Sequence, residues 1–294
     1  DLTQAVLDAA TALFGQQELP DEFKVGKRVS ASETWVQALD AIIADDPDFY
    51  GVIIESRTQA DIKAIGDDLT SKRSANTKLA LFLFQDNDAD WKTSGVPSGV
   101  STLDGKEGIV CCWHADDTED FDAAYAGSRL AWDPDVQSAP WNTKLSGVAN
   151  YATAVTESQK TEMDTNNANA GLKFYAAADF YVDPGRNMNG RPIYEVVSAD
   201  WFKTRLEERA AQLIVDLSDR GQKLPLDQRG QAKVIALVQG LFAEGIAAQH
   251  FAIDQTSITA EKISAADITA ERMRFTGSAQ LLRSARKLTF TFDF

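Results

Sequence analysis

Along the first 115 residues, short continuous apolar runs alternate with segments in which apolar residues recur every three or four positions. Shorter apolar runs predict strands at Phe23–Val29, Tyr50–Glu55, Leu79–Phe84 and Gly108–Trp113. Apolar residues spaced by three or four positions predict helices at Leu2–Phe14, at Glu33–Ala44 after an N-cap at Ser32, and around Ile62, Ile65 and Leu69. Helices that alternate with short, fully apolar strands indicate an α/β fold, with a mostly parallel sheet and helices on its faces.

The pattern changes between residues 115 and 171. A short Ala-rich helix is expected at Phe121–Leu130, and the Pro, Asn, Thr and Ser residues after it predict long connections with little regular structure. We therefore expect a boundary near Trp141, between an α/β domain over residues 1–141 and an α+β domain over residues 142–294. In the second domain the pattern predicts strands at Leu172–Tyr181 and Pro192–Val197, helices at Asp200–Leu217 and Asp227–Ala243, and a strand-rich end from Ile268 with Gly277 as a break or bulge.

The last eight residues have the period of two that is typical of a half-buried strand. One face carries Leu288, Phe290, Phe292 and Phe294, and the other carries Lys287, Thr289, Thr291 and Asp293. A terminal strand of this kind needs a sheet edge, because its backbone groups are a template for pairing. The edge can lie in the same molecule, as for most terminal strands, or in a neighbour that accepts the strand.

The composition of the chain argues against some kinds of binding partner. The 294 residues carry a net charge of −15, which argues against binding to nucleic acid or to anionic membrane surfaces. No apolar run approaches the ~20 residues that span a bilayer. Two adjacent cysteines are too few for a disulfide scaffold and indicate synthesis in a reducing, intracellular place. The first residue is Asp1 rather than Met, so we expect a trimmed chain or one that starts inside a longer gene product.

The most suggestive chemical cluster is Cys111-Cys112-Trp113-His114, followed by an acidic stretch. Alternation along a strand places Cys112 and His114 on one side, where a thiolate beside an imidazole could act as a nucleophile. The alternative interpretation is a strand end with buried thiols, since free cysteine is among the most buried residue types. One cysteine and one histidine do not complete a zinc site, so no metal is expected.

Three classes of function stay open at this point. No P-loop, G-x-S-x-G or complete G-x-G-x-x-G motif occurs, and no cofactor is implied. The absence of a catalytic set and the terminal strand favour a subunit of an assembly. The alternatives are a flavodoxin-like or hydrolase-like enzyme that uses Cys112 and His114, and a binder of small molecules at the edge of the sheet.

Several short motifs, taken in order, resemble the tail sheath proteins of contractile-tailed phages, especially a divergent sheath-like group. They are Phe14–Gly26, Thr143–Val148, the Asn-containing run Met163–Gly171, Gly190–Ile193 followed by Asp200-Trp201-Phe202, and Lys223–Gly230. The chain departs from the family in two places. It lacks the upstream N-terminal portion with the arm that reaches a neighbour, and Arg283–Lys287 replaces an expected Gly-Ala-Ile-His run.

The resemblance implies a non-enzymatic structural protein of the virion, assembled in the host cytoplasm. Copies of the chain would stack as hexameric rings around a tail tube protein, between baseplate and tail terminator proteins, and contract to drive the tube through the host envelope for genome ejection. Lys287–Phe294 would join the sheet of a neighbouring copy. Arg205, Arg209 and Arg220 are candidates for contact with an acidic tube surface, with solvated helix faces as the alternative.

Overall fold

The computed structural model describes residues 3–20, 22–148, 155–173 and 180–284. The chain divides into two compact units. The first comprises Asp1–Trp132 and Ala139–Val196, and the second comprises Asp133–Ser138 and Val197–Phe294. These units differ from the ranges 1–141 and 142–294, because β-strands beyond residue 141 pair with the sheet of the first unit. The two-domain division at Trp141 stays a prediction.

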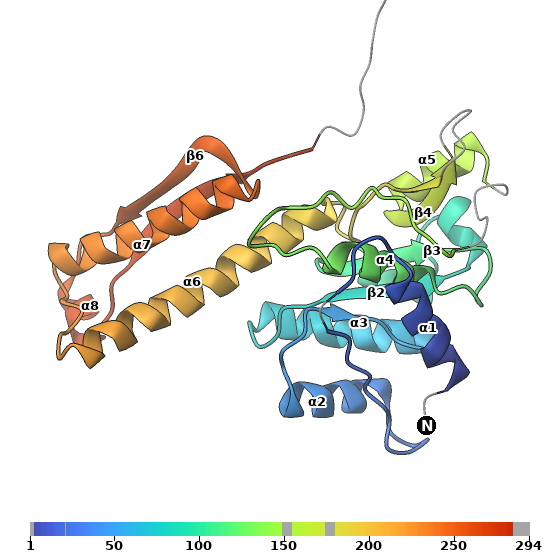
Figure 1. Ribbon diagram of the computed structural model, residues 1–294, viewed down its shortest axis with the longest axis horizontal. Coiled ribbons are helices and arrows are strands. Elements are labelled where there is room, and N and C mark those ends of the chain that lie inside the picture. Colours follow the sequence, from blue (N-terminus) through green and yellow to red (C-terminus); the bar gives the residue numbers. More distant parts are fainter. Residues whose placement is uncertain (1–2, 21, 149–154, 174–179, 285–294) are drawn as a thin grey trace, which may run out of the picture. The chain divides into compact units, whose positions relative to one another are not determined.

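A five-stranded sheet forms the centre of the first unit, in the order β1-β2-β3-β4-β5 (Figure 1). Its strands are β1 (Gly51–Val52), β2 (Leu81–Asp86), β3 (Ile109–Trp113), β4 (Ala168–Lys173) and β5 (Phe180–Asp183). The pairs from β1 to β4 are parallel, and β5 runs antiparallel to β4. Every residue of β2 and β3 is buried, as the continuous apolar runs predict. The mostly parallel α/β sheet expected from the sequence is thus confirmed.

Helices cover both faces of this sheet. The helices are α1 (Gln4–Phe14), α2 (Trp35–Asp45), α3 (Gln59–Ser74), α4 (Phe121–Leu130) and α5 (Glu157–Thr165), with 3-10 turns at Ala89–Lys92 and Ser101–Leu103. Ile62 and Ile65 of α3 share one apolar cluster with Phe82 and Phe84 of β2. Helix α4 lies on the other side of β2 and β3 (Figure 1), and α1 packs on α4. A side chain at Gly127 would meet the backbone of Leu13, so glycine permits this close approach.

The side chain of Asn169, in β4, connects this strand to β3 and to the turn after β5. Its side chain is completely buried, and its amide nitrogen donates to the carbonyls of Cys111 and Arg186 at 2.8 and 2.7 Å. Its amide oxygen accepts from the backbone of Gly185 and Arg186 at 2.8 and 2.9 Å. All four hydrogen-bonding positions of the amide are used, so the turn after β5 is held to the sheet by one side chain.

The second unit is a pair of long helices with a β-hairpin. It contains α6 (Ile193–Asp219) from Val197 onward, α7 (Gln228–Ala247), β6 (Phe251–Ala260), α8 (Ala265–Thr269) and β7 (Phe275–Leu281). The hairpin packs on α7 (Figure 1). The core of the second unit consists of buried Trp201, Val238, Leu241, Phe242 and Phe251. Asp227 caps α7 by accepting from the backbone of Arg229 and Gly230.

Several expectations about local structure are wrong. Phe23–Val29 contains no strand among its described residues, because Phe23 packs against Phe14 and Lys24 binds Asp46 instead. The predicted strand Pro192–Val197 is instead the start of α6, which begins at Ile193, directly after Pro192.

The structure also differs from the expectation at one helix cap, in one connection and at the bulge of the hairpin. The cap of α2 is Thr34, in a capping box with Gln37, and not Ser32. The stretch expected to be irregular contains α5 and part of β4. Strand β6 lies in a stretch where no strand was expected. The chain is regular at Gly277, and the bulge of the hairpin lies in β6 instead.

We expect Asn169→Ala to lower the free energy of unfolding by about 2–4 kcal/mol, because buried backbone groups at Gly185 and Arg186 lose their partner. The matched control is Asn166→Ala, which removes one hydrogen bond to the Trp91 carbonyl at a half-buried position. Urea unfolding followed by circular dichroism measures both. Equal small effects of the two substitutions would contradict the role of Asn169.

Candidate assembly surface

The hairpin of β6 and β7 presents its backbone at the surface of the second unit. The strands are antiparallel, with Ala260 opposite Phe275 and Thr256 opposite Ala279. The Glu261 N–H donates to the Arg274 carbonyl at 2.9 Å, which makes this a hydrogen-bonded pair. Because such pairs alternate with non-bonded ones, the backbone groups of Phe275, Gly277 and Ala279 point away from β6. Among the described residues, none of these three has a further backbone hydrogen bond.

The two faces of the hairpin differ in chemistry. Ile258, Ala279 and Leu281 pack against the apolar core of the unit, next to buried Phe251. The opposite face carries hydroxyl and amide side chains, among which Ser257 and Ser278 lie 2.8 Å apart across the strands. The hairpin is therefore amphipathic, with one apolar face toward α7 and one polar face in solvent.

Charged hydrogen bonds close the far end of the hairpin. Asp267 of α8 is buried and accepts from Ser264 at 2.5 Å and from Arg272 and Arg274 at 2.9 Å each. These donors, Ser264 first, hold the pKa of Asp267 well below its ordinary value. The connection between β6 and β7 is thus held together by its own side chains.

A strap of six residues, Asp133–Ser138, is held on the second unit next to α6. The buried His250 ring lies with Nε2 2.6 Å from the Pro134 carbonyl and Nδ1 2.7 Å from the Ser198 hydroxyl. A carbonyl can only accept, so Nε2 carries the proton. Burial lowers the pKa of His250, which favours the neutral ring. The ring stacks on Trp201 with 4.4 Å between the ring centroids, so His250 is a packing residue of the core.

Two of the three candidate arginines lie in a polar groove of about 410 Å³ beside the strap. Its lining residues are Asp135, Trp201, Arg205, Glu208, Arg209, Glu244 and Ala247. Arg205 donates to Asp135 and to Glu208, and Arg209 donates to both oxygens of Glu244 at 2.9 and 2.6 Å. Burial raises the pKa of Asp135, but hydrogen bonds from Arg205 and Trp201 outweigh it and lower that pKa overall.

The arginines therefore differ in their availability to a partner. Arg205 and Arg209 already face carboxylates of their own chain. Arg220 lies exposed just after α6 and forms no ion pair with another described residue. The terminal strand predicted at Lys287–Phe294 lies outside the described residues.

The cysteines do not form a reactive site. Cys111 and Cys112 are free thiols that are completely buried in β3. Burial, the largest cause, raises the pKa of both thiols well above the ordinary value, and Asp122 raises that of Cys112 further. His114 is buried too, and its Nδ1 lies 2.7 Å from the carbonyl oxygen and 3.1 Å from the backbone nitrogen of Asp116. A protonated, enclosed Cys112 is not a nucleophile at neutral pH, so the enzyme hypothesis loses its basis.

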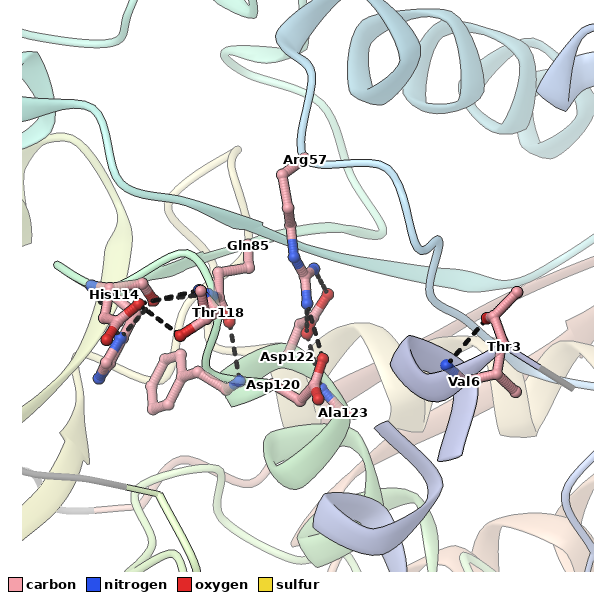
Figure 2. A network of polar contacts seen from close by, with 11 residues as sticks. Thr3, Val6, Arg57, Gln85, His114, Thr118, Asp120, Asp122 and Ala123 are labelled. Carbon is pink, nitrogen blue, oxygen red and sulfur yellow. Dashed lines mark hydrogen bonds and ion pairs between the residues drawn. The ribbon is translucent and has the colours of Figure 1, made fainter. Parts of the chain in front are cut away.

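A partly buried ion-pair network lies at the start of α4 (Figure 2). Arg57 donates to Asp122 at 2.5 and 3.1 Å and to Asp120 at 3.1 Å. Gln85 of β2 accepts from the first backbone N–H of α4, at Phe121. Burial and then the neighbouring Asp122 raise the pKa of Asp120 to about 6, although Arg57 opposes them. The carboxylates of Asp120 and Asp122 thus share the guanidinium of Arg57, and Gln85 binds the start of α4 to the carboxyl end of β2.

Neither a metal centre nor a membrane anchor emerges from the described parts of the chain. Nowhere in them do three or more His, Cys, Asp or Glu side chains gather in a way that could hold a metal ion. None of their helices combines the length and the apolar character needed to cross a membrane.

We expect Asp120→Asn to stabilise the protein above pH 6 and to have little effect near pH 4. The folded-state pKa is raised, so the folded protein binds the extra proton between about pH 4 and 6 and wild-type stability falls across that window. The gain at pH 8 is at most about 3 kcal/mol. Urea unfolding of both proteins at several pH values gives this difference, and a difference independent of pH would contradict it.

We expect Cys111 and Cys112 to resist a thiol reagent at pH 8 in the folded protein and to react together once it is unfolded in guanidinium. Absorbance of the released aromatic thiolate measures both. His114→Ala, as a control, should not make the folded protein reactive. Rapid labelling of the folded chain would restore the enzyme hypothesis.

Comparison with known proteins finds solved structures with a similar fold. Neither a family model nor a curated protein matches the sequence. A chain in the contracted helical sheath of the anti-feeding prophage matches with a TM-score of 0.65 at 13% identity, over 97% of this chain and 81% of that one. A chain in the six-fold symmetrised baseplate of the same prophage gives 0.63 at 13% identity, over 87% and 72%.

A crystal structure provides a third match. The sheath tail protein of Listeria innocua gives a TM-score of 0.58 at 12% identity, over 85% of this chain and 60% of that one. The matches therefore extend over most of the present sequence, although identity this low establishes the fold alone. The chain has the fold found in sheath proteins of contractile tails and contractile injection systems.

Proposed function

We propose that this chain is a structural, non-enzymatic subunit of a contractile tail sheath, and that copies join by adding a terminal strand to the hairpin of a neighbour. The observation that carries the proposal is the hairpin of β6 and β7, whose outer edges have backbone groups without a partner among the described residues. The fold shared with sheath proteins supports it.

The terminal segment matches the hairpin in chemistry. Its apolar residues, Leu288, Phe290, Phe292 and Phe294, alternate with polar ones in the same way as the residues of the hairpin. A strand added to the edge would direct the aromatic side chains to the α7 side, beside Ile258 and Leu281. Its Lys and Thr side chains would extend the polar face. Pairing through the backbone supplies affinity, and the alternate side chains supply specificity.

The proposed assembly has the geometry of an open helix. Heterologous contacts that do not close generate filaments, and here they would connect stacked hexameric rings around a tail tube. Contraction would drive the tube through a host envelope, with baseplate and terminator proteins at the two ends of a phage tail. No nucleotide is needed if subunits exchange one set of polar contacts for another of lower free energy.

The arginines suggest how the sheath could contact the tube. Arg205 and Arg209 would have to exchange Asp135 and Glu244 for carboxylates of the tube, which leaves little net gain at a solvated surface. Arg220 has no such intramolecular pair among the described residues and is the more favourable contact. We therefore rank Arg220 before Arg205 and Arg209 for the proposed contact.

The test is deletion of Lys287–Phe294. We expect the truncated chain to keep the thermal transition of the unassembled protomer and to lose self-association, measured by sedimentation velocity and negative-stain microscopy. The matched control is Thr289→Ser with Thr291→Ser, which changes the polar face and keeps the apolar one. Tubes formed normally by the truncated chain would contradict strand exchange as the basis of assembly.

A further inference from the structure

We infer that the irregular segment Val25–Val29 of one copy docks on the outward face of α6 of a second copy. The inference rests on the proposed function, because it names a further contact in the same assembly. Both surfaces expose apolar side chains, and the charges beside these side chains have opposite signs. Since the two surfaces differ, one copy can use both at once, and contacts of this kind extend an assembly without closing it.

The segment Val25–Val29 has no regular secondary structure, yet contacts with α2 and the residues before it hold the segment in place. It passes so close to α2 that a side chain at Gly26 would meet Ile42. At its end, the carboxylate of Glu33 accepts from the backbone N–H of Val29. The segment is therefore a preformed surface, so docking costs little ordering of its backbone.

Exposed valines and two cations give this segment its chemistry. Val29 is 90% exposed, more than any other large apolar side chain in the described part of the chain, and Val25 is exposed as well. Lys27 is exposed, and Arg28 is half-buried with its guanidinium over the ring of Trp35. Neither cation forms an ion pair with another described residue. Burial of Val29 would remove apolar surface from water, and the cations favour an acidic partner.

The outward face of α6 carries an apolar patch. Ala211, Ile214 and Val215 are all exposed, and their spacing by three and four residues places them side by side on the helix. The opposite face is already used, because Phe202 and Leu206 pack on the apolar core of the unit. The patch thus remains open to a partner within the described part of the chain.

Carboxylates border this patch. Glu207 and Glu208 lie one turn before it, and Asp219 follows it on the same face. Between Glu207 and Asp219 this face has no lysine or arginine, since helical spacing turns Arg209 toward the groove. Glu208 also accepts from Arg205. The face of α6 is therefore apolar with an acidic border, whereas the segment is apolar with basic neighbours.

These charges favour a second copy as the partner. Copies with a net charge of −15 repel one another, so a contact between them needs a local pairing of opposite charges. With Val29 on the patch beside Ile214, Glu207 lies about 10 Å further along the helix. Lys27 comes two residues before Val29, and its side chain can span the remaining distance.

Two exposed valines allow a matched test of the apolar contact. Val29→Ser removes apolar surface that touches little of its own chain, and Val136→Ser makes the same change at a valine that is 66% exposed on the strap. We expect Val29→Ser to raise the protein concentration needed for assembly about tenfold, and Val136→Ser to leave it nearly unchanged. Sedimentation velocity measures both. Equal assembly of the two variants would overturn the inference.

Two exposed lysines test the charges. Lys27→Glu should weaken assembly by a similar factor, and more strongly at low than at high salt. Lys233→Glu, on α7, makes the same change of net charge and is the control. Equal effects of the two reversals would reduce the result to general repulsion between copies and overturn the pairing with α6.

Disulfide cross-linking between two different chains identifies the face that is used. Chains with Val29→Cys are mixed with tagged chains that carry Ile214→Cys, so a mixed disulfide can only join two copies. The control uses Ile268→Cys, because Ile268 on α8 is 57% exposed and Ile214 is 58% exposed. We expect mixed dimers with Ile214→Cys and few with Ile268→Cys. Native Cys111 and Cys112 are buried and do not interfere.

The outcomes separate this inference from the proposed function. An assembled protein in which Val29→Cys and Ile214→Cys chains stay unlinked would leave the face of α6 to a different protein and overturn the inference, while the proposed function stands. As many links through position 268 as through position 214 would also overturn it. An unmodified chain that never assembles would count against both.

Discussion

A two-stranded sheet satisfies only half of the backbone groups of each strand, and this constraint governs the second unit. An isolated hairpin is marginal in water, so β6 and β7 depend on the apolar surface of α7 for their stability. Packing on α7 covers the apolar face of the hairpin, and its outer edges pair with no other strand among the described residues. Within that part of the chain, the hairpin combines a stable place in the fold with backbone groups that could accept a further strand.

Each of the two units is held together internally by its own polar contacts. In the first unit, Asn169 uses all four hydrogen-bonding positions of its amide, and Arg57 donates to buried Asp122, so these side chains hold the loops to the sheet. In the second, the strap bound through His250 and Asp135 and the buried Asp267 of α8 do the same. Polar networks of this kind specify one arrangement when every member is satisfied. An assembly that rearranges as rigid bodies needs subunits of this kind.

The sequence predicted the sheet well and the hairpin poorly, for physical reasons. Strands β2 and β3 are continuous apolar runs, and α4 matches its predicted bounds because a single periodic segment defines it. Strand β6 escaped prediction because its bulge breaks the alternation of residues around Asp254. Asp135 and Glu244, which bind Arg205 and Arg209, lie 70 and 35 residues away in the chain, so no local pattern could indicate them; only Glu208, three residues after Arg205, is a local partner. The motifs of the sheath family pointed to the correct fold even though each is short.

Hydrogen exchange of individual amides, compared between the assembled and the unassembled protein, shows whether the hairpin accepts a further strand. We expect the outward N–H groups of Phe275, Gly277 and Ala279 to exchange rapidly in the protomer and to become protected on assembly, since strand addition gives each of them a carbonyl partner. The inward amides of Thr276 and Ser278 should already be protected in the protomer. Rapid exchange, in the assembled state, of these three amides of β7 and of the outward amides of Thr256, Ile258 and Ala260 on β6 would contradict assembly by strand addition.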